Sequence, residues 1–124
     1  MTTERSLAEQ VAERLNAALP AHIHVEIPPG TADFAILSTD GWWGTQGFGF
    51  HPGSSIAELA DQLEIALSGI QDAVAHATNG AWPELEDGEL PIPWATIAED
   101  ELQFGFGQRV VLPPIPLAAL GSAE

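Results

Sequence analysis

The segment from Ser55 to Gly80 carries the strongest pattern in the chain and constrains the fold most tightly. Ser55 and Glu58 have the S-x-x-E spacing of a capping box, and Asn79-Gly80 is a typical helix end. Apolar residues recur between these signals at intervals of three and four: Ile56, Leu59, Leu63, Leu67, Ile70, Val74 and Ala77. The spacing predicts one long helix whose apolar face must be buried against other elements.

A second helix and five alternating segments complete the predicted fold. Leu7, Val11, Leu15 and Leu19 predict a helix over 4–19. Alternation predicts strands over 22–27, 33–39 and 42–50, and then over 94–98 and 101–107. Asp40-Gly41 is a two-residue hairpin signal, and Glu99-Asp100 joins the last two strands.

Strands and helices do not alternate along this chain as they do in parallel α/β proteins. We therefore expect an α+β fold in which an antiparallel sheet of about five strands packs against two helices. The order is α-β-β-β-α-β-β. The 124 residues form one expected domain, with a core over 1–109 and an apolar, proline-rich tail over 110–124.

Aromatic residues and glycines are interleaved in two of the predicted strands, "WWGTQGFGF" (42–50) and "FGFG" (104–107). Four phenylalanines share the inner faces of these strands and are expected in the core, with a ligand cage as the alternative: Phe48, Phe50, Phe104 and Phe106. The glycines leave the opposite faces bare, open to solvent or to another backbone. Gly69, in the long helix, is likewise expected to permit close backbone approach.

Trp42 and Trp43 are adjacent in one predicted strand, so they cannot share a face. At least one of them is expected at the surface or at an interface, where tryptophan is a frequent contributor to binding. Both are candidate partner-binding residues.

The charge balance narrows the expected partners. The chain has 18 acidic residues against three arginines and no lysine, a net charge of −15. This argues against nucleic acids and anionic membrane surfaces, and it favours a basic protein or peptide. The alternative is that the acidity serves solubility. An acidic strip in the 83–93 segment is either a solvated loop or a docking site: Glu84, Glu86, Asp87 and Glu89.

Targeting and redox signals are missing from the sequence. Its start has no basic region followed by an apolar one, so we expect no signal peptide. No apolar run reaches the roughly 18–20 residues that span a bilayer. The lack of cysteine excludes disulfides and thiolate chemistry. A cytoplasmic protein is the expectation.

Histidines provide the one candidate for metal chemistry. His22 and His24 share a strand face, His51 ends another strand, and Glu26 could join them as a ligand. No H-E-x-x-H pattern, G-x-S-x-G elbow or dinucleotide loop accompanies them. We therefore expect no cofactor and assign no catalytic residue, while a small metal-dependent enzyme remains an alternative.

The tail alternates apolar residues with Pro113, Pro114 and Pro116. A segment this apolar is expected to pack against another protein surface. It packs either on its own domain or against a partner, which could be a second copy in a homodimer. Val111, Leu112 and Ile115 are the candidate contact residues.

The order α-β-β-β-α-β-β, the acidity and the small size resemble those of the class I type III secretion chaperones and their bacterial relatives. The resemblance covers most of the chain as topology, with the proline-rich tail standing where that family has a third helix. It implies an acidic dimer that holds a client segment along hydrophobic grooves. The expected function is a non-enzymatic, acidic protein-binding module, chaperone-like or immunity/antitoxin-like. A phage-type or structural assembly protein is a further alternative.

Overall fold

The computed structural model describes residues 3–30, 33–47, 56–78, 80, 82–83, 85, 88–108 and 110–116. The helices are α1 (Thr3–Ala18) and α2 (Ile56–Thr78). The longer strands are β1 (Ile23–Glu26), β2 (Phe34–Ser38), β3 (Trp43–Gln46), β4 (Pro93–Ala98) and β5 (Glu101–Phe106). Two short strands follow, β6 (Val110–Val111) and β7 (Ile115–Pro116). The predicted α+β class and the order α-β-β-β-α-β-β are confirmed.

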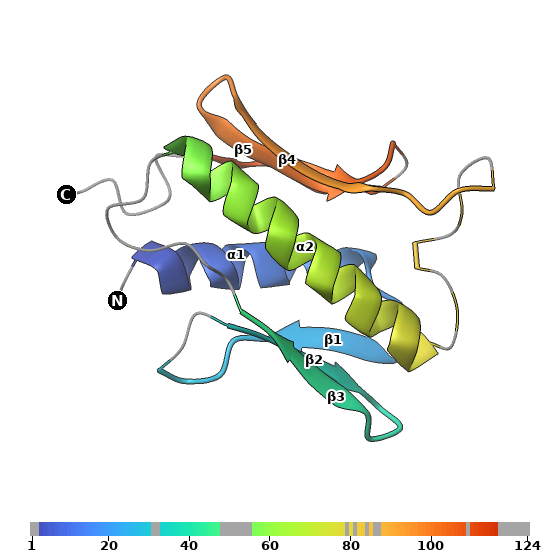
Figure 1. The fold of residues 1–124 in the computed structure, drawn as a ribbon. Helices are drawn as coiled ribbons and strands as arrows, with labels where there is room; N and C mark the ends of the chain where they lie inside the picture. Colours follow the sequence, from blue (N-terminus) through green and yellow to red (C-terminus); the bar gives the residue numbers. More distant parts are fainter. Residues whose placement is uncertain are drawn as a thin grey trace.

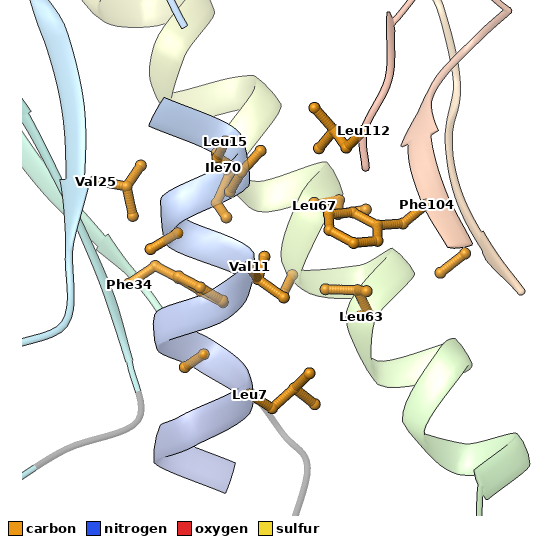
Figure 2. Close-up of a cluster of buried hydrophobic side chains, with 14 of the residues drawn as sticks. Leu7, Val11, Leu15, Val25, Phe34, Leu63, Leu67, Ile70, Phe104 and Leu112 are labelled. Atoms are coloured by element: carbon orange, nitrogen blue, oxygen red, sulfur yellow. The ribbon is translucent and has the colours of Figure 1, made fainter. Parts of the chain in front are cut away.

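The strands form two antiparallel sheets where the sequence suggested one. The N-terminal sheet has the order β1-β2-β3, and the C-terminal sheet consists of the β4-β5 hairpin extended by β6 and β7. Both helices lie between these sheets (Figures 1 and 2). The two sheets therefore turn their inner faces toward the helices and their outer faces away from them.

The core lies in this helical layer. Figure 2 shows Phe34 directed toward α1 from one sheet and Phe104 directed toward α2 from the other. Phe104 and Phe106 are fully buried, which confirms the core prediction for these two residues. The other two phenylalanines of the interleaved pattern, Phe48 and Phe50, lie outside the described residues.

Polar side chains of the helices form hydrogen bonds with the backbone at two sheet edges. Asn16 of α1 accepts a hydrogen bond from the backbone N–H of Val25 (2.7 Å) and donates to its carbonyl oxygen (3.0 Å). On α2, the Glu64 carboxylate accepts a hydrogen bond from the backbone N–H of Ala95 (3.0 Å). These contacts satisfy backbone groups of β1 and β4 that the sheets leave unpaired.

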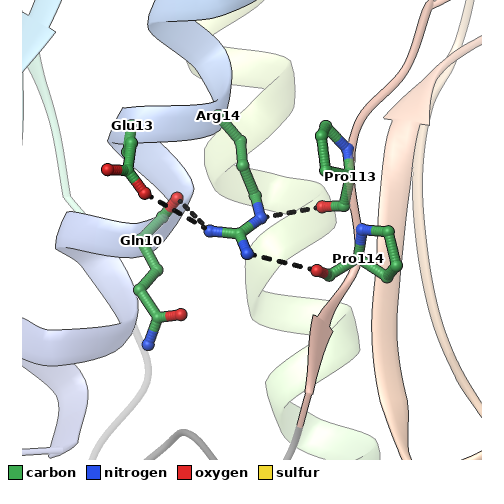
Figure 3. Close-up of polar contacts among 5 residues, drawn as sticks. All are labelled: Gln10, Glu13, Arg14, Pro113 and Pro114. Atoms are coloured by element: carbon green, nitrogen blue, oxygen red, sulfur yellow. Dashed lines mark hydrogen bonds and ion pairs between the residues drawn. The ribbon is translucent and has the colours of Figure 1, made fainter.

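The tail packs on the chain itself along β5. Val110 and Val111 pair with Phe106 and Gly105, and Ile115 pairs with Leu102. Proline carbonyls between the two short strands face α1, where Arg14 donates to Pro113 (2.8 Å) and Pro114 (3.2 Å), as Figure 3 shows. Charge-assisted hydrogen bonds therefore hold the tail against the first helix.

Two glycines permit close approach, and they do so in different ways. A Cβ on Gly105 would collide with the carbonyl oxygen of Val110, so the tail backbone occupies the space that this glycine leaves. Gly69 was also expected to face a backbone, but the structure corrects this. The side chain of Gln46 from β3 lies against it instead.

The two hairpins use different turns. Gly41 donates to the Ser38 carbonyl (3.0 Å), and Ser38 donates to the Trp42 carbonyl (2.9 Å). The first loop therefore has three residues, with Gly41 in the left-handed region (φ 99°), and not the two residues expected from Asp40-Gly41. The second loop has two residues, Glu99 (φ 55°) and Asp100 (φ 61°), both left-handed.

Replacing Asp100 with glycine is expected to stabilise the protein. A left-handed side-chain-bearing residue is strained, and type I′ turns favour glycine at this position. Relief of this strain outweighs the greater freedom of glycine in the unfolded chain, so we expect Asp100→Gly to raise the free energy of unfolding by about 0.5–1 kcal/mol in urea titration. The control, Asp72→Gly on the exposed face of α2, removes the same charge and should destabilise by a few tenths of a kcal/mol. Equal gains from both variants would attribute the effect to charge and contradict the turn argument.

Candidate functional site

The outer face of the N-terminal sheet gathers residues that the sequence singled out separately. The strand register places His24, Leu37 and Trp43 in one row across β1, β2 and β3. Neighbours in such a row have Cβ atoms about 4.5–5.5 Å apart. The inward-facing neighbours Val25 and Ile36 are buried, so this row faces away from the helices. Imidazole, leucine and indole thus lie side by side on the outer face.

Trp42 and Trp43 separate to opposite faces of β3. Trp42 packs against the core and its indole lies 5.5 Å, centroid to centroid, from the ring of His76 in the last turn of α2. Trp43 is 68% exposed. Trp42 therefore joins β3 to α2, and Trp43 is the tryptophan that a partner can reach.

The histidines of β1 are engaged locally. His24 Nε2 lies 2.7 Å from Glu26 Oε2, and both side chains are exposed. His22 is exposed at the start of the strand, and His51 lies outside the described residues. Within the part of the chain that the structure describes, no three His, Asp or Glu side chains gather as a metal site would require.

Carboxylates lie at both ends of β3. At the hairpin end, Asp40 accepts hydrogen bonds from Ser38 Oγ (2.6 Å) and from the backbone N–H of Trp42 (3.3 Å). The Ser38 bond first, then the Trp42 bond and the nearby His22, hold the pKa of Asp40 below its usual value. At the other end, Asp33 Oδ1 lies beside Gly47. A negatively charged side chain thus lies near each end of β3.

No protein-family model, curated protein or solved structure matches this chain. The likeness to class I type III secretion chaperones therefore rests on element order, acidity and size, without a matching sequence or structure. Neither described helix is long and apolar enough to cross a membrane.

The remaining candidate residues are divided between surface and core. Val111 is exposed, whereas Leu112 and Ile115 are buried in the core of the chain itself. For those two residues the structure matches the alternative in which the tail packs on its own domain. Glu89 is exposed, and the rest of the acidic strip, Glu84, Glu86 and Asp87, lies outside the described residues.

Sequence reasoning did not single out Leu37 or Thr45 as site residues. Alternation assigned Leu37 to the face opposite Phe34, and this was the available signal. Its position beside Trp43, and that of Thr45 beside Ala35, follow only from the register. The register depends on the length of the hairpin loop, which the sequence left ambiguous.

Proposed function

We propose that this chain is an acidic protein-binding module that holds a positively charged protein segment at the outer face of the N-terminal sheet. The exposure of Trp43 is the observation that carries the proposal. An indole offers a large apolar surface, and tryptophan is among the residues that most often dominate binding energy. Leu37 extends this apolar surface across the sheet.

The charge supports a basic partner. The chain has 18 acidic residues and three arginines. One of the arginines, Arg14, is only 18% exposed and donates its hydrogen bonds within the chain. The remaining field is strongly negative, which speeds encounter with basic surfaces and disfavours acidic ones.

The proposed role is non-enzymatic, either chaperone-like or immunity/antitoxin-like. The element order that resembles the class I chaperones favours the chaperone-like form. No contact among the described residues favours the metal-dependent enzyme or the assembly protein, since His24 is engaged with Glu26 and the described tail lies along β5.

Replacing Trp43 with alanine is expected to weaken partner binding about tenfold, in line with loss of a binding hot spot. The test is affinity capture from the native host with three baits: wild type, Trp43→Ala and Ile65→Ala. Ile65 on α2 has a similar exposure, 60%, and lies on a different element, so it controls for loss of any exposed apolar side chain. A basic protein retained by wild type and Ile65→Ala but lost from Trp43→Ala is the expected result. Equal retention by all three baits would contradict the assignment of Trp43.

A further inference from the structure

We propose that the outer edge of β3 accepts an extended, positively charged segment of a partner protein as an added strand of the N-terminal sheet. The inference rests on the proposed function and specifies how that function is carried out. It commits to backbone pairing along β3, whereas the proposed function requires only a basic partner on this face.

Groups of the chain itself cover parts of the other sheet edges. Asn16 pairs with both backbone groups of Val25 on β1, and Glu64 accepts the N–H of Ala95 on β4. The far side of β5 is covered by β6 and β7, and the tail that forms them carries Pro113, Pro114 and Pro116. Prolines lack the N–H that a further strand would need, and they are a common protection of exposed edges.

The edge of β3 has no such cover among the described residues (Figure 1). Ser38 donates to the carbonyl of Trp42, which fixes the alternation of hydrogen bonds between β2 and β3. Gly44 and Gln46 therefore direct their backbone groups toward β2, and Trp43 and Thr45 direct theirs away from it. Two N–H donors and two carbonyl acceptors thus point outward along this edge. No described group forms a backbone hydrogen bond with them.

Charge complementarity identifies the occupant. Asp40 lies at one end of β3 and Asp33 at the other, beside Gly47. A strand rises about 17 Å from Trp42 to Gly47, so an added strand of about six residues would reach both ends. A segment with lysine or arginine near each end of such a stretch would meet both carboxylates. A second copy of this chain is disfavoured, because β3–β3 pairing would join two chains of net charge −15 and oppose their carboxylates.

The test uses two synthetic peptides of equal length and charge, with blocked ends. One alternates lysine and valine and can pair as a strand (the valine peptide). The other has the same residues with every backbone nitrogen methylated, so it cannot donate the backbone bonds. Binding to the ¹⁵N-labelled protein is followed by titration, and amide hydrogen exchange is followed by NMR. We expect the valine peptide to bind at least tenfold more tightly. Its binding should slow exchange of the Trp43 and Thr45 amides at least tenfold.

A variant pair isolates the backbone of β3. Thr45→Pro removes an N–H that points away from β2, so the ladder of the sheet is retained. Thr45→Val changes the same side chain and keeps the N–H. We expect Thr45→Pro to weaken the valine peptide about tenfold and Thr45→Val to bind it like wild type, with unchanged circular dichroism in both.

The outcomes separate the two proposals. Equal binding of both peptides, with no protection of Trp43 and Thr45, would overturn strand addition while leaving a basic partner in place. Equal binding of the valine peptide by Thr45→Pro and Thr45→Val would also overturn it. If neither peptide binds, strand addition by a basic segment is overturned, and the capture experiment with Trp43→Ala then decides the proposed function independently.

Discussion

Gly105→Ala is expected to lower the free energy of unfolding by about 2–3 kcal/mol, the range of a severe overpacking substitution. The added methyl group would collide with the carbonyl oxygen of Val110 and would lie 3.1 Å from the Cα of Val111. Both neighbours are backbone atoms, which cannot rotate aside as a side chain can. Relief requires β6 to move away from β5, and with it the buried Leu112. Urea unfolding measures the loss.

Gly47→Ala provides the matched control for this substitution. Its nearest neighbour outside the adjacent residues would be Asp33 Oδ1 at 3.8 Å, an ordinary contact distance. We expect its stability to stay within about 0.5 kcal/mol of wild type, as is usual for surface substitutions. If Gly105→Ala proves no more destabilising than Gly47→Ala, the approach of the tail does not require a glycine at position 105.

Arg14→Ala is expected to destabilise the protein by about 2 kcal/mol, within the range of hydrogen bonds to charged groups. The guanidinium donates to the carbonyls of Pro113 and Pro114 from α1, and also to the carbonyl of Gln10 (Figure 3). Its removal leaves the two proline carbonyls without their donor and frees the tail from the helix. Urea unfolding should show the loss, and limited proteolysis should cut the tail earlier than in wild type.

Two further variants at this site separate geometry from charge. Arg14→Lys keeps the positive charge but lacks the planar fork that reaches two carbonyls at once, so it should recover only part of the stability. Glu13→Gln tests the ion pair, whose nitrogen and oxygen lie 3.8 Å apart with the Glu13 side chain 82% exposed. Such surface pairs contribute little. An effect of Glu13→Gln as large as that of Arg14→Ala would mean that the ion pair, and not the proline carbonyls, gives Arg14 its role.

The sequence predicted those parts of the fold that local periodicity controls. The intervals of three and four placed both helices, and the alternation of Ile23 and Val25 with His24 correctly predicted which side of β1 is buried. The division into two sheets was not predictable in this way. Strands β3 and β4 do not pair, and whether they do depends on where α2 lies between them. That is a question of packing between distant segments.

Which of the two tryptophans is exposed was likewise not predictable from local alternation. The sequence separates Trp42 from Trp43 but does not say which of them faces outward. A two-residue loop would pair Trp43 with Ser38, on the side of the buried Ile36. The observed three-residue loop, closed by Gly41, pairs it with Leu37 on the outer face. One residue of loop length therefore decides which tryptophan is exposed.

The contact of Arg14 with the tail has a consequence for how the chain matures during synthesis. Arg14 and Pro114 are separated by 100 residues, so the contact cannot form until nearly all of the described chain has left the ribosome. The hairpin of β4 and β5 is complete earlier, and until the tail arrives it presents the unpaired side of β5 beside Phe104. Long-range pairings of this kind form late and leave such edges open to misassembly in the interval. The tail thus covers the open side of β5 once it has been synthesised. Its prolines lack the N–H groups with which a further strand could pair.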